Sequence, residues 1–184
     1  MSLLSYNELC KLIDDGIIER SDVENVNSAS IDLVLGRNIM AERKPMPWES
    51  NEISMLDKHA KHLELHQMTD CGILVPPGAC ILAETVEVFN LHNAISGEYM
   101  LKSTQARNFF GHLKAGWADA GWNGSVLTLE FVNHLQHHST RIKPGMKCGQ
   151  IIFFDHAPVP DDRSYAKRGQ YNGDKIVTSG KGLK

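Results

Sequence analysis

The chain has 184 residues, of which 42% are hydrophobic and 22% are charged, and its formal net charge is −3. This length and composition predict one globular domain, residues 1–184, with enough apolar residues to bury a core. A mildly acidic chain without a basic run is a poor candidate for binding a nucleic-acid polymer.

The cysteines and the first residues indicate where such a protein works. Cys10, Cys71, Cys80 and Cys148 form no C-x-x-C pair, so reduced thiols in a cytosolic protein are the simplest interpretation. The first ten residues lack a basic region followed by an apolar one, and no run approaches the ~18 apolar residues of a membrane span. We therefore expect a cytoplasmic protein with no membrane partner.

The first predicted element is a helix over residues 5–16. Ser5 and Glu8 have the spacing of a capping box, positions 9, 12 and 13 carry an apolar stripe, and Gly16 ends the helix. A short strand is predicted next, over residues 31–35, where apolar residues alternate, and Gly36 ends it.

Residues 37–67 are polar and irregular. Two groups of histidines, here and further on, lie close enough in sequence to suggest metal ligands: His59, His62 and His66 with Glu64, and His134, His137 and His138. Solvated histidines are the commoner explanation, and no cysteine lies at zinc spacing. We expect no metal site.

The remaining pattern outside residues 102–133 is one of strands and turns. Residues 76–78 predict a turn, and residues 79–89 alternate like a long strand with Glu84 and Glu87 as its outward charges. Residues 99–101 predict a short strand, and a turn at Pro144-Gly145 leads into another over residues 148–154. Repeated strands with one or two helices predict a mainly β domain.

Residues 102–107, Lys-Ser-Thr-Gln-Ala-Arg, predict a short helix with Ser103 or Thr104 at its N-cap. A helix start offers unpaired N–H groups, to which Lys102 and Arg107 add full charges. This combination suits a phosphate group. An ordinary capped surface turn is the alternative that the same residues allow.

Residues 115–124 place three glycines around one carboxylate, Asp119. Glycines allow positive φ and a close approach of backbone to ligand, while Trp117 and Trp122 can wall an apolar slot. Asp119 is then an acceptor for a sugar hydroxyl or a water. A hairpin turn with aromatic packing is the alternative.

Residues 125–132 predict a strand with Leu127, Leu129 and Phe131 on one face. Glu130 lies on the other face, among apolar neighbours, which is a suitable environment for a general acid or base. A glutamate on the solvent face of a strand is the alternative.

The order of these motifs resembles that of the dCTP deaminase family, in the trimeric dUTPase superfamily. Residues 102–107 resemble its Arg-Ser-Ser-x-x-Arg motif, and residues 115–124 resemble its Ala-Gly-(Trp/Phe)-Ile-Asp-x-Gly-(Phe/Trp)-x-Gly loop. Residues 127–133 resemble the strand of its catalytic glutamate, residues 143–150 its Pro-Gly-Met-x-x-Gly-Gln turn, and residues 28–36 its Ser-Ser-x-Asp-Leu-Arg-Leu-Gly opening.

The resemblance implies a fold, an assembly and ligands that periodicity alone does not supply. The fold is a distorted β-barrel or jelly-roll-like dUTPase fold, and the assembly is a homotrimer with active sites shared between subunits. The ligands are dCTP and dUTP, with dTTP as a feedback inhibitor in some members. Mg²⁺ rides on the triphosphate, and no zinc is expected because the H-x-E and P-C-x-x-C signature of zinc deaminases is absent.

The C-terminal residues resemble the family's lid. Residues 161–182 are rich in Gly, Lys, Arg and Asp, so we expect residues 161–184 to be mobile without a nucleotide. Residues 170–175 resemble the Lys-Tyr-Gln-Gly-Gln-(Lys/Arg) tail that folds over the ligand. Gln170 and Asp174 depart from its Lys and its second Gln, and Tyr165 stands for an earlier tail tyrosine at a shorter spacing.

The resemblance also implies roles. Glu130 is the general base and then the acid that deaminates cytosine, Ser103 orients the attacking water, and Arg107 balances charge beside Glu130. Gly116, Trp117 and Gln150 resemble the branch that also cleaves dUTP to dUMP and diphosphate, in which Asp119 activates water. The implied nucleotide-binding residues are Lys102, Ser103, Thr104, Gln105, Ala106, Arg107, Ala115, Gly116, Trp117, Asp119, Thr128, Leu129, Glu130, Gln150, Tyr165, Gln170, Tyr171 and Asp174.

One departure bears on Glu130. The interval from Gly124 to Glu130 is one residue longer than in the family, and an extra residue reverses a strand's facing unless a bulge absorbs it. We expect a bulge near residues 125–126. Without it, a dUTP diphosphatase alone is the alternative, and the altered tail leaves a third reading open, a nucleotide-binding barrel without catalysis.

Overall fold

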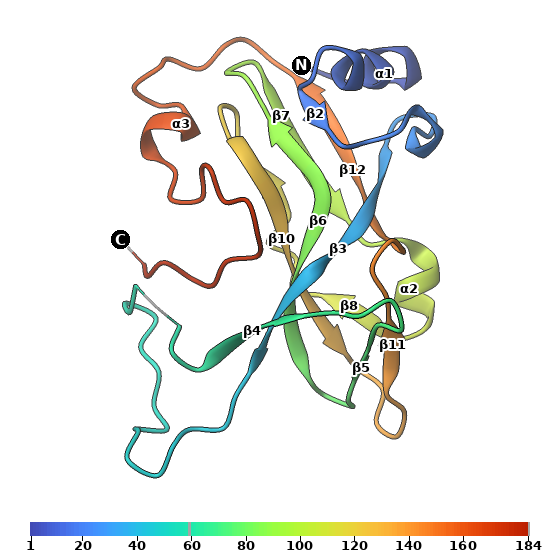
Figure 1. Cartoon of the computed structure of the whole chain (residues 1–184). Helices are drawn as coiled ribbons and strands as arrows, with labels where there is room; N and C mark the ends of the chain where they lie inside the picture. The colour runs from blue at the N-terminus through green and yellow to red at the C-terminus, as the bar shows by residue number, and fades with distance from the viewer. Residues whose placement is uncertain (59, 184) are drawn as a thin grey trace.

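The computed structural model describes residues 1–58 and 60–183, and its architecture confirms the mainly β prediction. Within these residues one sheet of ten antiparallel strands curls into a half-barrel, as Figure 1 shows, in the order β8-β10-β6-β3-β12-β7-β9 with β1, β2 and β4 at its sides. A small sheet pairs β11 with β5. The strands are β1 Ser2–Leu3, β2 Ile18–Glu19, β3 Ile31–Glu42, β4 Leu63–Gln67, β5 Ile73–Val75, β6 Cys80–Asn90, β7 Ile95–Met100, β8 Phe110–His112, β9 Trp117–Ala118, β10 Asn123–Asn133, β11 Thr140–Ile142 and β12 Lys147–Asp155.

The helices are short and lie at the edges of the half-barrel (Figure 1): α1 Tyr6–Asp14, the 3-10 helix η1 Val23–Asn25, α2 Ser103–Arg107 and α3 Tyr165–Arg168. The predicted capping box of the first helix is confirmed, because the Ser5 N–H donates to the Glu8 carboxylate at 2.8 Å. Leu9 and Leu12 are buried on one side of α1. No helix in the described part of the chain is long and apolar enough to cross a membrane.

The core lies inside the curled sheet. Phe89, Phe131 and Phe153 are fully buried and come from three strands, β6, β10 and β12. The ring of Phe89 stacks on that of Trp122 at 5.3 Å between centroids. Burial of large side chains from neighbouring strands is the main stabilising contribution in such a sheet.

The prediction that Gly36 ends a strand is wrong. Strand β3 continues to Glu42 and pairs there with β4, so both ends of the stretch expected to be irregular, residues 37–42 and 63–67, are β-strand. Glycine is needed at position 36 for another reason: a Cβ there would meet Cγ of Glu84 at 2.5 Å. The polar sequence of β4 reflects its exposure, since most of its side chains face solvent.

The prediction that Glu84 and Glu87 point outward is also wrong, because both are buried. The Glu84 carboxylate accepts hydrogen bonds from the Asn38 amide and from the Val177 N–H, each at 2.7 Å. The Glu87 carboxylate accepts from the N–H of Val34 at 3.1 Å, and burial raises the pKa of Glu87 to about 7. Glu84 lies where the pairing of β3 with β6 is irregular, and Glu87 lies where the pairing of β10 with β6 shifts. Each acid accepts a hydrogen bond from a backbone N–H, so both satisfy main-chain donors inside the sheet.

The predicted bulge in β10 is confirmed. The pairing of β10 with β6 shifts between Asn123 and Ser125 and again between Val126 and Thr128, and Gly124 has φ +67°. Glu130 therefore stays off the face that carries the buried Leu129 and Phe131, and its side chain remains 25% exposed.

The C-terminal segment lies beside β10 (Figure 1). The Val126 N–H donates to the carbonyl oxygen of Asp174 at 2.9 Å, and the Gly173 N–H donates to that of Asn123 at 3.1 Å. Val177 is buried, so this segment adds an apolar contact to its hydrogen bonds. Its mobility without a ligand stays a prediction.

Candidate active site

Helix α2 begins one residue earlier than expected, so the N-cap prediction is wrong. Lys102, whose backbone is extended, is the N-cap, and the N–H groups of Gln105 and Ala106 donate to its carbonyl oxygen. Ser103 and Thr104 are therefore the first helical residues and their hydroxyls are not used in capping. Ser103, Thr104 and Arg107 are exposed, and within the described residues no hydrogen bond or ion pair occupies their side chains.

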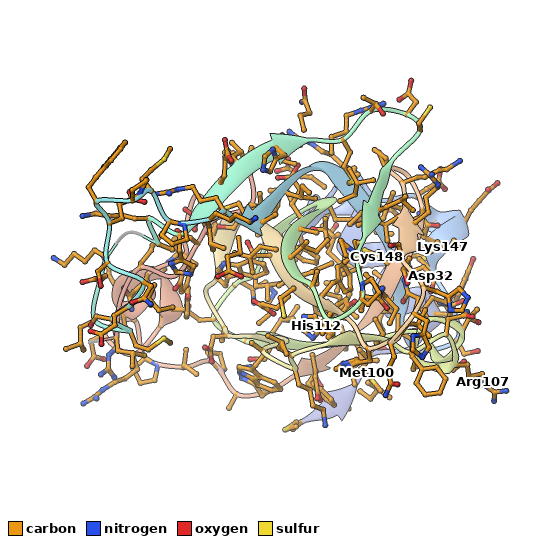
Figure 2. All side chains as sticks on the ribbon, turned by 90° about the horizontal axis from the view of Figure 1, so that it is seen from below. Asp32, Met100, Arg107, His112, Lys147 and Cys148 are labelled. Atoms are coloured by element: carbon orange, nitrogen blue, oxygen red, sulfur yellow. The ribbon has the colours of Figure 1, made fainter. Side chains whose placement is uncertain are left out.

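The ammonium group of Lys102 is held by a buried carboxylate. Asp32, whose side chain is 4% exposed, accepts hydrogen bonds from Lys102, from Lys147 at 2.8 Å and from Asn27 at 2.9 Å. Burial alone raises the pKa of Asp32, but the hydrogen bonds from the two lysines outweigh it and hold the pKa below its usual value. Figure 2 shows Asp32 and Lys147 together at one end of the sheet. This ion cluster fixes α2 to β3 and β12.

The loop around Asp119 is held by close backbone packing. A Cβ at Gly116 would meet the carbonyl oxygen of Tyr99 at 2.8 Å, and Gly121 has φ +86°. The indole N–H of Trp117 donates to Asp119 at 3.0 Å. The expected slot between two tryptophans is not found, because Trp122 stacks in the core and only Trp117 is exposed.

Asp119 borders a cavity of about 280 Å³. Tyr165, Arg163 and Arg168 also line it, so the structure brings Asp119 together with the predicted tail tyrosine and with two guanidinium groups. The N–H of Tyr165 donates to the carbonyl oxygen of Ala120 at 3.0 Å, which anchors α3 at this loop. One carboxylate and two cations suit a phosphate ester with a sugar hydroxyl.

Glu130 faces a histidine that the sequence interpretation missed. The Nε2 atom of His112, on the neighbouring strand β8, lies 3.0 Å from Oε2 of Glu130. The His112 side chain is 5% exposed, and its ring packs on that of Tyr99 at 4.7 Å between centroids. The sequence around His112 gave little indication of this role, because a single histidine near the end of a short strand forms no recognisable motif with its neighbours.

The tail residues gather on the outer side of β10. The N–H of Thr178 donates to the Thr128 hydroxyl at 3.4 Å, and the indole N–H of Trp122 donates to the Tyr171 carbonyl oxygen at 2.8 Å. The Asp174 carboxylate forms an ion pair with Lys181, at 2.8 and 2.7 Å from its two oxygens. The charge that distinguishes Asp174 from the family's glutamine is therefore balanced within the tail.

The other predicted residues divide between the core and the surface. The Leu129 side chain is fully buried, so only its backbone is available to a ligand. Gln150 accepts from the Ser30 hydroxyl at 3.4 Å and lies opposite Asp32 in the sheet, while Gln105 donates to the Lys147 carbonyl oxygen at 3.1 Å. Gln170 donates to the carbonyl oxygen of Gly182 at 3.3 Å.

The structure of one chain does not bring Arg107 to Glu130. Among the described residues, no ion pair or hydrogen bond joins the two, and the partner of Glu130 is His112. Figure 2 shows Arg107 at the periphery, pointing away from His112. The resemblance implies a site shared between subunits, so the placement of Arg107 beside Glu130 of another subunit stays a prediction.

No group of three or more histidine, cysteine or carboxylate side chains is arranged for a metal ion in the part of the chain that the structure describes. Of the first histidine group, His66 lies 3.7 Å from Glu64, whereas His59 lies outside the described residues.

A family model described as dCTP deaminase-like matches residues 3–156. The chain is 33% identical over 193 residues to "dCTP deaminase, dUMP-forming" of Nanoarchaeum equitans, with 96% of each chain covered. It is 29% identical over 184 residues to a protein of the same name from Persephonella marina, covering 96% of this chain and 95% of that one.

The fold is also found in a solved structure. The 2'-deoxycytidine 5'-triphosphate deaminase from Agrobacterium tumefaciens superposes with a TM-score of 0.64 at 18% identity. The match covers 82% of this chain and 47% of that chain, so this chain spans about half of its length. At this identity the likeness concerns the fold alone.

Proposed function

The chain belongs to the dCTP deaminase-like family, and on that premise we propose that it deaminates dCTP to dUTP and then hydrolyses dUTP to dUMP and diphosphate. The observation that carries the first step is the position of Glu130. The bulge in β10 keeps this carboxylate off the core face despite the additional residue, beside His112. The second step is supported by the names of two relatives, "dCTP deaminase, dUMP-forming", which the chain matches over nearly their whole length.

The deamination needs one group that moves protons. Water attacks C4 of cytosine while Glu130 accepts one proton from the water and passes it to N3. Glu130 then takes the remaining proton of the C4 hydroxyl and passes it to the amino group, which leaves as ammonia while the C4 carbonyl forms. A partly exposed carboxylate at the edge of an apolar core can perform both steps in turn. Thr128, two residues earlier on the same face of β10, is positioned to contact the base beside it.

We further propose that the site is completed by a second copy of the chain within a homotrimer. Ser103 and Arg107 are exposed and have no partner among the described residues, so they are available to the nucleotide of a neighbouring subunit. Four apolar side chains are exposed on the segment from β7 to β9, which supports burial of this surface against another subunit: Met100, Phe109, Leu113 and Trp117.

The second chemistry is assigned to the cavity at Asp119. Asp119 activates a water for attack on the α-phosphorus, and Arg163 and Arg168 bind phosphate oxygens. Asp119 is the carboxylate at the cavity, so a Mg²⁺ ion would be carried mainly by the triphosphate and would supply neutralisation of phosphate charge. Residues 161–184 are the lid over the nucleotide, and a cytoplasmic location is part of the same proposal.

The test is a chromatographic product assay with purified protein and Mg²⁺, in which dCTP, dUTP and dCMP are supplied separately. Conversion of dCTP to dUMP, diphosphate and ammonia supports both steps. Accumulation of dUTP removes the hydrolytic step and the role of Asp119. Reaction of dUTP alone refutes the deaminase assignment, and no reaction with any of the three leaves nucleotide binding without catalysis.

A further inference from the structure

We propose that His112 is a positioning residue that holds the Glu130 carboxylate through a neutral imidazole with its proton on Nε2. This inference rests on the proposed deaminase function. It assigns a role to a residue that lies outside the predicted site and that contacts Glu130 rather than the substrate.

The tautomer follows from the partner of the other ring nitrogen. The backbone N–H of Lys114 points at Nδ1 of His112 at 3.0 Å, so Nδ1 must act as an acceptor. In a neutral imidazole the single ring proton is then on Nε2, which faces Glu130. A doubly protonated ring would set an N–H at Nδ1 against the Lys114 N–H, which disfavours the imidazolium form.

The pair is isolated from other polar groups. His112 Nε2 and Glu130 Oε2 are both buried, and no third polar atom among the described residues bonds to either. At 3.0 Å there is no room for a water between them, yet their alignment falls short of a straight hydrogen bond. Catalytic hydrogen bonds often tighten only when substrate is bound. The two atoms therefore have only each other, and a small rotation of the carboxylate completes the bond.

The surroundings keep the ring in place. Tyr99 packs on one side of His112, and Phe131 lies edge-on at 6.0 Å between ring centroids. The Tyr99 hydroxyl donates to the carbonyl oxygen of Cys148 at 2.6 Å, and burial raises the pKa of Tyr99, so this neighbour stays neutral. Glu130 is therefore the charged side chain that the ring contacts.

The backbone on both sides of β8 is strained. Phe109 and Lys114 have φ of +56° and +67°, values that non-glycine residues seldom adopt. Such strain collects at functional sites, where surrounding contacts maintain it. At Lys114 the unusual φ accompanies the N–H that fixes the His112 tautomer.

The contact with His112 determines which carboxylate oxygen of Glu130 accepts the proton from water. With Oε2 bonded to Nε2–H, Oε1 of Glu130 is left to receive the proton from water. His112 keeps its own proton throughout, so it orients the base without exchanging protons with the substrate.

The experiment compares the kinetics of dCTP deamination in H112L, H112Q and an exposed control, H137L. Glutamine retains an N–H donor near the place of Nε2, whereas leucine does not. We expect H112L to lower kcat about 10- to 100-fold, as loss of an orienting hydrogen bond commonly does, with KM within about threefold. H112Q should recover most of kcat, and H137L should behave as the wild type.

A kcat for H112L within about threefold of the wild type overturns the proposal. So does an H112Q that is as slow as H112L with an unchanged melting temperature. Independently, long-range ¹H–¹⁵N NMR of the wild-type protein at neutral pH should show the Nε2–H tautomer, and an Nδ1–H or doubly protonated ring overturns the proposal. If the wild type releases no ammonia, the proposed function fails, while the NMR result still decides the state of His112.

Discussion

Replacement of Asp32 by asparagine tests whether the cluster with Lys102 and Lys147 is a structural ion pair. The D32N amide can accept a hydrogen bond from one lysine, but it leaves two ammonium groups without a counter-charge. Breaking a buried ion pair costs about 3–5 kcal/mol. The lysine side chains are 31% and 49% exposed and can turn toward water, so we expect the free energy of unfolding to fall by about 2–3 kcal/mol.

The measurement is urea denaturation of wild type, D32N and a matched control, D70N. Asp70 also pairs with a cation, Arg37 at 2.6 Å, but its side chain is 87% exposed, so D70N should leave the midpoint unchanged. Because the pKa of Asp32 is lowered on folding, its stabilisation is present above about pH 4 and is lost as the pH falls through the folded-state pKa. A D32N midpoint equal to that of D70N at pH 7 would refute the reasoning.

Three other predictions concern carboxylates and one glycine. E130Q should abolish ammonia release and preserve nucleotide binding by calorimetry, and substantial remaining deamination excludes Glu130 as the base. The pKa of Glu87 rises from 4.5 to about 7 on folding, so its ionisation opposes folding and the free energy of unfolding falls as the pH rises between these values. E87Q cannot ionise, so we expect a smaller fall, measured by denaturation at several pH values. G36A should destabilise the fold by about 1–3 kcal/mol and lower the melting temperature, because its Cβ would overlap Glu84. The control G180A, whose Cβ would meet no atom within 4 Å, should leave the melting temperature unchanged. Equal melting temperatures of the two variants would contradict this.

Sequence patterns predicted correctly those structural elements that depend on interactions between residues close together in the chain. The capping box at Ser5 and Glu8 specifies the start of α1, and the interval before Glu130 required a bulge that the sheet contains. The capping box depends on residues three positions apart, so the sequence alone carries that signal, whereas the bulge was expected only because the interval is longer than in the family that the chain resembles.

The errors arose where the decisive partner is distant in sequence. Glu84 and Glu87 read as outward charges on their strand, but the pairing of β6 with β3 and with β10 is irregular around them, and both carboxylates bond backbone N–H groups of distant residues. Gly36 looked like a strand end because the Glu84 side chain that fills its space is far along the chain. His112 was missed since only the pairing of β8 with β10 places it at Glu130.

The hydrogen bond from the Val177 N–H to Glu84 limits how far the C-terminal segment, which we propose as a lid, can move. The same carboxylate also accepts from Asn38, so releasing Val177 would bring water to a buried acid inside the sheet. Further back, the segment is anchored by the Tyr165 N–H on Ala120, and its middle is held to β10 through Gly173 and Asp174. A segment that is already held at several points has fewer conformations to lose than a free tail. The lid that we propose would therefore close over a nucleotide at a lower cost in conformational entropy.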